Sequence, residues 1–151
     1  MLKLSRLADY GIVIMTHCAK QRGRSANASD IAAATGVPAP MASKVLKLLT
    51  RGELLVSQRG AKGGYILARD ASAITIREII TALDGPIALT ACVDEGAEGC
   101  DLHRLCPAAT NWQRINDAIR DALDGITLSE MASTIPPAFG VGDVRIAARQ
   151  G

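Results

Sequence analysis

The order of helix, turn and hairpin signals in the first 70 residues constrains the fold of this chain more than any other feature. Asn27 is a favourable N-cap for a short helix over Ala28–Thr35, and Gly36 is a residue that commonly ends helices. Pro40 suits the first turn of a following helix, which we expect to end at Gly52 as a left-handed cap. Two helices joined by a tight turn predict a helix-turn-helix.

A basic hairpin is expected directly after this unit. Two strand-like runs, residues 54–58 and 65–68, flank the segment Arg59-Gly60-Ala61-Lys62-Gly63-Gly64. A glycine-rich tip between two strands is typical of a wing, and a helical stripe over residues 4–19 precedes the whole unit. The sequence therefore predicts a mainly α fold with a small β-hairpin wing, a winged helix-turn-helix domain over residues 1–70.

The second half carries a long loop and a long helix. A fourth helix is expected from Thr75, and residues 86–107 form a loop too long for a plain connector. A fifth helix, from about residue 107 to 123, has an apolar stripe that packs either within its own chain or on a second copy; the stripe consists of Trp112, Ile115, Ile119 and Leu123. Thr127 and Glu130 have the spacing of a capping box for one more helix. We assign residues 71–131 to the loop and a dimerisation helix, and residues 132–151 to a mobile tail.

Charge is divided between the two halves. Residues 1–70 hold 11 Lys and Arg against 4 Asp and Glu, a net charge of +7, whereas residues 71–151 have a net charge of −5. A basic front half is typical of a module that binds a polyanion. On the third helix, Ser43, Lys44 and Lys47 are expected to point away from the core, where they can meet base edges and phosphates in a major groove.

The wing supplies a second contact with DNA. Arg59 and Lys62 lie on its glycine-rich tip, which can approach a narrow and electronegative minor groove. One winged helix covers too little DNA for high specificity. We therefore expect a homodimer on double-stranded DNA with a pseudo-palindromic operator.

Three cysteines lie within fifteen residues of the long loop. Cys92, Cys100 and Cys106 lack the paired spacing of a zinc ribbon, and thiolates favour iron–sulfur clusters, zinc or copper(I). A metal-free loop and a zinc site remain alternatives to a cluster. His103, in the loop, and Asp9, on the first helix and contributed by a partner subunit, are both candidates for a fourth ligand. Cys18 lies on an apolar helical face and is expected in the core, not at a metal.

Other function classes are disfavoured. No stretch of about 18 apolar residues exists, so no membrane span is expected. The charged first ten residues lack the apolar block of a signal peptide, which predicts a cytoplasmic protein. No set of nucleophile, base and orienting group is recognisable, so we expect no enzyme.

Together these motifs resemble the Rrf family of winged-helix iron–sulfur transcription regulators, over about residues 1–131. The resemblance is carried by residues 4–10 (LSRLADY), the wing at residues 59–65 and the three-cysteine loop. Residues 85–92 (GPIALTAC) and Asn111-Trp112 are most similar to the branch that regulates SUF cluster-assembly genes.

The resemblance implies a dimeric regulator with a [2Fe–2S] cluster on Cys92, Cys100 and Cys106, while related members hold [4Fe–4S]. In the IscR type a histidine follows the last cysteine by three residues, but here that residue is Ala109. In the NsrR type an aspartate of the first helix completes the site, and Asp9 matches it, so the resemblance favours Asp9 over His103.

The expected function is therefore a transcription regulator whose operator affinity depends on an iron–sulfur cluster. One alternative is a regulator of the same fold that senses nitric oxide, thiol oxidation or zinc. Another, from a different class, is an iron–sulfur carrier that binds no DNA.

Overall fold

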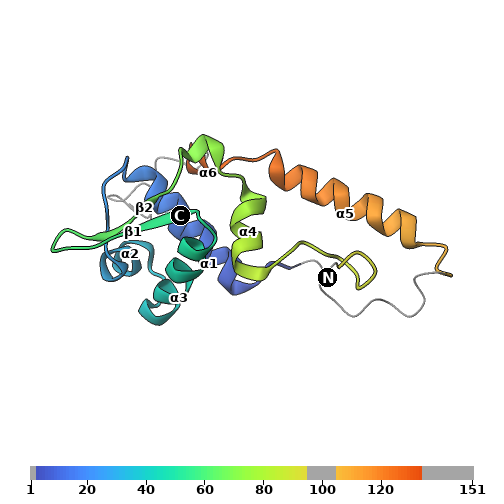
Figure 1. Ribbon diagram of the computed structural model, residues 1–151, viewed down its shortest axis with the longest axis horizontal. Coiled ribbons are helices and arrows are strands. Elements are labelled where there is room, and N and C mark those ends of the chain that lie inside the picture. The colour runs from blue at the N-terminus through green and yellow to red at the C-terminus, as the bar shows by residue number, and fades with distance from the viewer. Residues whose placement is uncertain (1–2, 95–104, 134–151) are drawn as a thin grey trace, which may run out of the picture.

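The fold is mainly helical with one small antiparallel hairpin, as the sequence predicts. The structure, a computed structural model, describes residues 3–94 and 105–133. Figure 1 shows a helical body from which one helix projects. The elements are α1 (Arg6–Lys20), α2 (Ala28–Thr35), α3 (Ala39–Arg51), β1 (Leu55–Gln58), β2 (Gly64–Leu67), the 3-10 turn η1 (Ala71–Ala73), α4 (Ile76–Asp84), α5 (Ala109–Asp124) and α6 (Leu128–Ser133).

Side-chain caps set most helix boundaries. The Asn27 side chain accepts a hydrogen bond of 2.8 Å from the Asp30 backbone N–H at the start of α2, and Gly36 ends this helix with a left-handed φ of 73°. At α6, Glu130 Oε2 accepts from the Thr127 backbone N–H, and the Thr127 hydroxyl accepts from the Glu130 N–H. The predicted caps at Asn27 and Thr127 are confirmed, because each satisfies a backbone group that the helix itself leaves unpaired.

The predicted left-handed cap at Gly52 is wrong. Gly52 has a φ of −79°, and the next residue, Glu53, takes the left-handed conformation with a φ of 60°. A Cβ atom on Gly52 would lie 2.8 Å from the Cβ of Ala82 on α4. Glycine is therefore needed there because α3 and α4 approach closely, and not because the backbone requires a positive φ.

One aliphatic core joins α1, α2, α3, α4 and α6. It includes the completely buried side chains of Ile14, Ile31, Leu46, Ile79 and Leu128. α1 lies at the centre of this body, since it packs against α2, α3, α4 and α6 and also contacts β2. This core contains residues from both before and after residue 70, where the predicted winged domain ends. α4 therefore belongs to the same scaffold that holds α3 in place.

The hairpin is joined to the body by a third extended segment. β1 pairs antiparallel with β2, with Leu55 opposite Leu67 and Gln58 opposite Gly64. Ala26 forms a bridge to Tyr65, in which the Tyr65 N–H donates to the Ala26 carbonyl at 2.8 Å. A Cβ on Gly64 would lie 2.4 Å from that same carbonyl oxygen, so a side chain there would push the hairpin off the body.

α5 contacts α4 and then extends away from the helical body (Figure 1). The chain after it returns to the start of α4, where the Ile76 N–H donates to the Ile126 carbonyl and the Leu128 N–H to that of Ile74. The predicted tail beyond residue 133 lies outside the described residues. Across residues 3–94 and 105–133, no helix is long and apolar enough to cross a membrane.

Candidate nucleic-acid interface and cysteine site

α3 presents cationic side chains opposite its buried face. Val45, Leu46 and Leu49 are buried, while Lys44 and Lys47 are exposed. This division follows from the helical period, since residues three and four apart share a face. The structure therefore places the two predicted lysines on one outward-facing side of α3, where they are accessible to a polyanion.

Ser43 is only partly exposed, although the sequence predicts that it points away from the core. Its side chain is half-buried, whereas those of Lys44 and Lys47 are exposed. Ser43 lies near the N-terminal end of α3, at which recognition helices commonly meet base edges.

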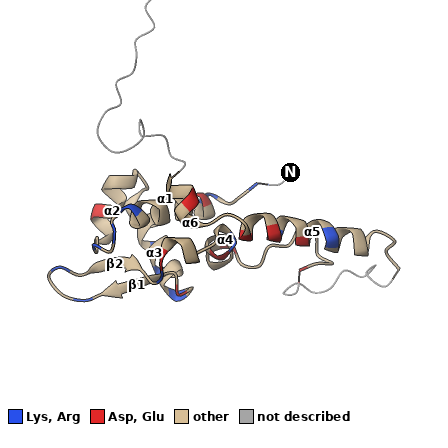
Figure 2. Cartoon of the chain, turned by 90° about the horizontal axis from the view of Figure 1, so that it is seen from above, with Lys and Arg blue, Asp and Glu red and all other residues tan. Residues whose placement is uncertain are grey.

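The wing holds its basic residues at an exposed tip. Arg59 and Lys62 are both exposed. The Ser25 hydroxyl donates to the Lys62 carbonyl at 2.9 Å and ties the tip to the loop before α2. In Figure 2 the ribbon is blue, for Lys and Arg, at the hairpin tip and in neighbouring loops, while red segments, for Asp and Glu, recur along α5. The charge division of the sequence is thus also a division in space.

Two shallow hollows beside the wing contain cationic residues that the sequence prediction omitted. One lies between α3 and the hairpin and is lined by Lys47, Thr50, Arg51, Ser57 and Tyr65. The other lies between the start of α2 and the wing tip, and Arg24 and Lys62 contribute to it. The fold brings Arg51 and Arg24 beside the wing, because each hollow is formed by residues that are distant in sequence.

The segment from residue 86 to 94, here called the cysteine arm, leads from α4 to the first loop cysteine. Its backbone is bound to two side chains of α5. Asn116 Oδ1 accepts from the Leu89 N–H and Asn116 Nδ2 donates to the Ile87 carbonyl, both at 3.1 Å, and Arg120 Nε donates to the same carbonyl at 3.2 Å. Further along, the Thr90 hydroxyl lies 3.0 Å from Cys92 Sγ, and the side chain of Val93 is buried.

Two of the three predicted cluster cysteines can be located. Cys92 and Cys106 are half-buried free thiols, and Cys106 lies just before α5, where its carbonyl accepts from the Ala109 N–H. Cys100 and the alternative ligand His103 lie outside the described residues. The two located thiols lie close in sequence to the two ends of the undescribed segment 95–104.

Asp9, the other candidate ligand, is exposed in the first turn of α1. Within the described part of the chain, no three Cys, His, Asp or Glu side chains come together as a metal-binding group. The structure therefore does not bring Asp9 together with Cys92 and Cys106 inside one chain. Ser5, which caps α1, donates a hydrogen bond to Asp84 at the end of α4, next to the cysteine arm.

Cys18 is a core residue, as its position on the apolar face of α1 predicts. Its side chain is 6% exposed, and burial raises the pKa of its thiol to about 11. A thiol in such surroundings stays protonated and is a poor metal ligand. Cys18 is thus distinct from the half-buried cysteines of the loop.

Asn116 is a residue that the sequence analysis missed. Its side chain is completely buried, and among the α5 residues it alone is fully buried. The available signal was an asparagine within the apolar face of a helix, four residues after Trp112 and three before Ile119. Helical periodicity alone cannot indicate which backbone groups such an amide binds.

Comparison with models of known protein families matches most of the chain to one family. Residues 4–134 match the model of the Rrf2 family, described as iron-dependent transcriptional regulator. The HTH-type transcriptional regulator IscR of Yersinia pseudotuberculosis is 34% identical over 105 residues, which cover 70% of this chain and 63% of the relative. The match thus spans less than two thirds of the length of that relative. IscR of Sodalis glossinidius is 29% identical over 133 residues, covering 87% of this chain and 79% of the relative.

Solved structures agree with this result. CymR, described as the global cysteine regulator of B. subtilis, superposes with a TM-score of 0.68 at 33% identity, covering 88% of this chain and 98% of CymR. IscR of T. potens has the same TM-score at 27% identity and covers 94% of each chain. These relatives are regulators and not enzymes, which confirms the prediction that the chain is no enzyme. The chain therefore belongs to the Rrf2 family of iron-dependent transcriptional regulators.

Proposed function

We propose that the chain is a homodimeric DNA-binding transcription regulator whose operator affinity is controlled by an iron–sulfur cluster on Cys92, Cys100 and Cys106. One observation carries this proposal: a basic helix and wing at one end of the described structure and a cysteine arm towards the other are joined by the same helical body (Figure 1). The family membership supports the regulatory part, and the thiol donors support the cluster.

DNA binding rests on α3 and the wing. Lys44 and Lys47 on α3, together with Arg59 and Lys62 on the wing, offer exposed cations to phosphates, and Ser43 offers a hydroxyl to a base edge. Release of counterions by such cations supplies much of the affinity for a duplex. Shape complementarity comes from α3 in the major groove and the wing tip beside the minor groove.

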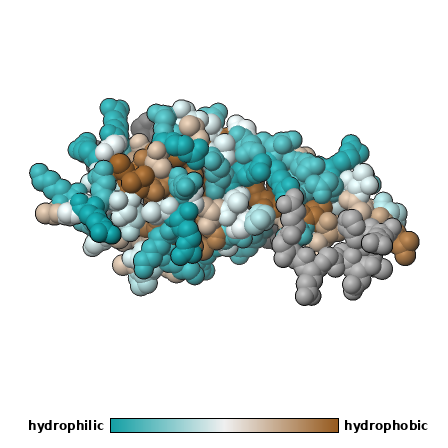
Figure 3. All heavy atoms as spheres, viewed as in Figure 1, coloured by the Kyte–Doolittle hydropathy of each residue, from teal (hydrophilic) through white to brown (hydrophobic). Residues whose placement is uncertain are grey.

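Dimerisation is proposed through the open face of α5. Trp112 and Ile115 are 39% and 45% exposed, although both belong to the apolar stripe of this helix. Figure 3 shows a mainly hydrophilic surface with scattered hydrophobic patches, some of which lie towards the end where α5 projects. Pairing of two such faces would remove the apolar area from water and place two copies of α3 on one pseudo-palindromic operator.

The donor set fits an iron–sulfur cluster. Cys92 and Cys106 are free thiols that are neither fully buried nor fully exposed, which leaves their sulfur atoms accessible while the surroundings limit water. A [2Fe–2S] cluster is favoured, and [4Fe–4S] is the alternative. When bound, the cluster supplies a redox-active centre whose presence depends on iron and oxidants. Asp9 of a partner subunit is the preferred fourth ligand, and His103 is the alternative.

The chain's own residues transmit the state of this site. The three thiolates would fix the ends of the loop, and the cysteine arm and the start of α5 adjoin those ends. A change in operator affinity requires the loaded and unloaded forms to differ in their free energy of DNA binding. The target genes are proposed to be those for SUF cluster assembly, from the resemblance of residues 85–92.

DNA binding is tested with charge-removing variants. Lys44→Ala and Arg59→Ala should each weaken binding to a random-sequence duplex and reduce the salt slope by about one. Lys3→Ala removes the same charge from an exposed residue at the N-terminus, away from α3 and the wing, and serves as control. Unchanged affinity and slope in both test variants contradict the proposed interface.

The cofactor is tested separately. After anaerobic reconstitution, wild-type protein should contain iron and sulfide and show visible charge-transfer absorption, and a variant with serine at Cys92, Cys100 and Cys106 should remain colourless. Colourless wild-type protein that binds zinc stoichiometrically would exclude the cluster.

A second candidate is a regulator of the same fold that responds to cysteine or to thiol oxidation. The similarity to CymR, a global cysteine regulator also solved in an oxidised form in Staphylococcus aureus, favours it. Wild-type protein that stays free of iron but changes its DNA affinity on mild oxidation would select this function. An iron–sulfur carrier, in contrast, would hold the cluster and bind no DNA in either state.

A further inference from the structure

We propose that Asn116 is the positioning residue that couples the cysteine arm to the dimerisation helix, so that events at Cys92 reach α5 through its buried amide. This inference rests on the proposed function, because it names the physical link through which the cluster controls DNA binding. It concerns side chains on α5 and backbone groups in residues 87–89, all of which the structure describes.

The geometry of the Asn116 amide is that of a two-point attachment. Its oxygen accepts from the Leu89 N–H and its nitrogen donates to the Ile87 carbonyl, each at 3.1 Å. The side chain is 0% exposed. Both ends of the amide are therefore bonded to main-chain groups of the cysteine arm. These main-chain groups belong to neither a helix nor a strand, so the amide supplies the hydrogen bonds that a helix or a sheet would otherwise provide.

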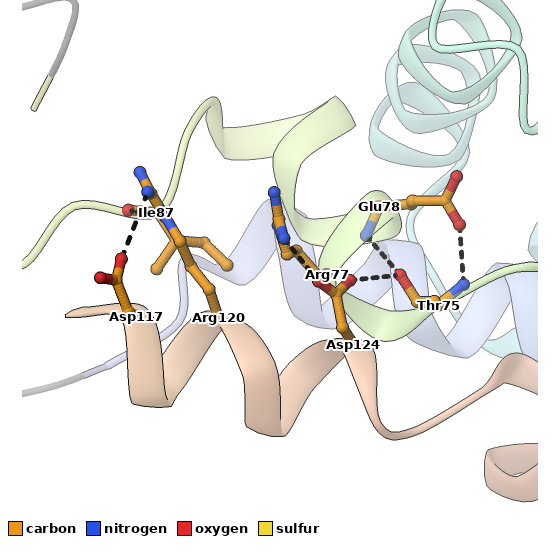
Figure 4. Close-up of polar contacts among 7 residues, drawn as sticks. All are labelled: Thr75, Arg77, Glu78, Ile87, Asp117, Arg120 and Asp124. Atoms are coloured by element: carbon orange, nitrogen blue, oxygen red, sulfur yellow. Dashed lines mark hydrogen bonds and ion pairs between the residues drawn. The ribbon is translucent and has the colours of Figure 1, made fainter. Parts of the chain in front are cut away.

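Arg120 reinforces this attachment one helical turn later. Its Nε donates to the same Ile87 carbonyl at 3.2 Å, and its guanidinium also lies near Asp117. Figure 4 shows Arg120 reaching from α5 to Ile87, with Asp117 beside it. The Ile87 carbonyl thus accepts from two side chains of α5, which fixes the base of the cysteine arm against one face of the helix.

The same helix is attached at its other end to α4. Asp124 pairs with Arg77 and accepts from the Thr75 hydroxyl at 3.2 Å (Figure 4). Within the described residues α5 therefore has two polar attachments outside itself, a surface one at the start of α4 and a buried one at the cysteine arm. Only the buried one lies close in sequence to a proposed cluster ligand.

The link from the amide to the sulfur is short. Cys92 lies three residues after Leu89, and the intervening turn is closed by the Val93 N–H, which donates to the Thr90 carbonyl at 3.1 Å. Burial of Val93 and the contact of Thr90 with Cys92 Sγ fix both sides of this turn. A displacement of Cys92 is therefore transmitted to Leu89 and Ile87, and from them to Asn116.

On the other side, Asn116 adjoins the proposed dimer face. It follows Ile115 directly and Trp112 by one helical turn, and both of these apolar side chains are exposed. A shift of α5 at Asn116 therefore displaces the surface that we propose contacts the second copy. Apolar residues cannot substitute here, because they would leave the Leu89 N–H and Ile87 carbonyl without these partners.

The test replaces the amide while keeping its approximate size. Asn116→Leu removes both hydrogen bonds, and Gln113→Leu makes the same apolar change at an exposed residue one turn earlier in α5. In the cluster-free, full-length protein, the Leu89 amide should exchange its hydrogen at least about tenfold faster in Asn116→Leu, since a buried pair is lost. Gln113→Leu should exchange like the wild type.

The second readout is the ratio of operator dissociation constants between cluster-free and cluster-loaded protein. The operator is a duplex that the wild-type protein has selected from a random library. The wild-type ratio should differ clearly from one, and Asn116→Leu should move it close to one at equal iron content, while Gln113→Leu keeps it. An unchanged ratio in Asn116→Leu overturns the coupling, as does unchanged exchange at Leu89.

Two further outcomes are separable. If Asn116→Leu does not fold, Asn116→Asp keeps the size and the oxygen that accepts from Leu89 but loses the donor to Ile87. The Leu89 amide should then stay protected, and the ratio of dissociation constants alone decides: a ratio close to one supports the coupling, and an unchanged ratio overturns it. If the wild-type ratio itself is one, the proposed function fails and the coupling fails with it. If the wild-type ratio differs from one and neither Asn116 variant alters it, the role of Asn116 is refuted while the proposed function stands.

Discussion

At the scale of single residues, the cysteines of this chain have different environments and therefore different chemistry. Cys18 lies in the aliphatic core, whereas Cys92 and Cys106 are half-buried next to the loop. Since the thiolate is the reactive and metal-binding form, burial in an apolar core makes a cysteine inert. The position of Cys18 on the apolar stripe of α1 was sufficient to predict this difference.

Alkylation should report the difference directly. Burial raises the pKa of Cys18 to about 11, so at pH 8 only about one thiol in a thousand is ionised. Iodoacetamide at pH 8 should therefore modify Cys92 and Cys106 in the cluster-free protein while Cys18 stays unmodified, as read by peptide mass spectrometry. Unfolding in urea should make all of them react, and equal rates in the folded protein would contradict the burial of Cys18.

Site residues were predictable where their chemistry is visible in the residue type. The lysines of α3, the tip residues Arg59 and Lys62 and the cysteine motif are of this kind. Asn116 and Arg24 are not, because their roles arise from contacts between distant segments. An asparagine in an apolar stripe indicates a buried polar contact, but its backbone partners at Ile87 and Leu89 depend on how the loop folds.

At the scale of elements, the start of α4 is a junction between three parts of the fold. Thr75 and Glu78 form a reciprocal capping box, and Arg69, just after the hairpin, pairs with Glu78 at 2.8 Å. Thr75 also bridges to Thr127 in the segment that follows α5. One helix end thus connects the wing, α4 and the return from α5.

The carboxylate at this junction should make stability depend on pH. Burial acts to raise the pKa of Glu78, but hydrogen bonds from the Thr75 backbone and from Arg69 outweigh it, so that the pKa is lowered. Its contribution is therefore complete above the pKa of an unfolded glutamate and is lost as pH falls, between about pH 5 and pH 3.

Urea unfolding across this range should detect the effect. Wild-type protein should lose more stability between about pH 5 and pH 3 than Glu78→Gln, because the variant lacks the titrating group. Glu53→Gln, at an exposed carboxylate outside the cap, should follow the wild-type curve. Parallel curves for wild type and Glu78→Gln would contradict the role of the Glu78 cap.

Helix and hairpin boundaries were predictable to within a residue or two because local rules set them. Capping at Asn27, Thr75 and Thr127 depends on neighbours three residues away, and the sequence contains those neighbours. The reason for Gly52 was misread because it is tertiary: Ala82 of α4 lies against it. Local patterns record backbone preferences, but not which helix later packs beside a residue.

At the scale of the whole molecule, α5 is only partly covered by its own chain. The side facing α4 and the cysteine arm is bonded, whereas Trp112 and Ile115 remain exposed. The sequence left open whether this stripe packs within the chain or on a second copy. The structure packs Leu123 against the core of its own chain, while the earlier turns leave their apolar side chains open, as the proposed dimer requires.

A charge on the open face should prevent dimerisation. Ile115→Glu should give a monomer in sedimentation equilibrium, because pairing would bury a carboxylate in an apolar contact. Gln113→Glu introduces the same charge on an exposed residue outside the stripe and should remain dimeric. Emission of Trp112, the single tryptophan, should shift to shorter wavelength as wild-type protein is concentrated but not in Ile115→Glu. A dimeric Ile115→Glu protein would exclude this face.

The central claim is that an iron–sulfur site formed by three cysteines changes how tightly this regulator binds DNA. The most direct measurement compares operator affinity of cluster-loaded wild-type protein with that of the variant carrying serine at Cys92, Cys100 and Cys106, both verified by iron analysis. We predict affinities that differ by about tenfold or more, within the usual range for coupled binding sites. Equal affinities, with the wild-type protein fully loaded, would contradict the claim.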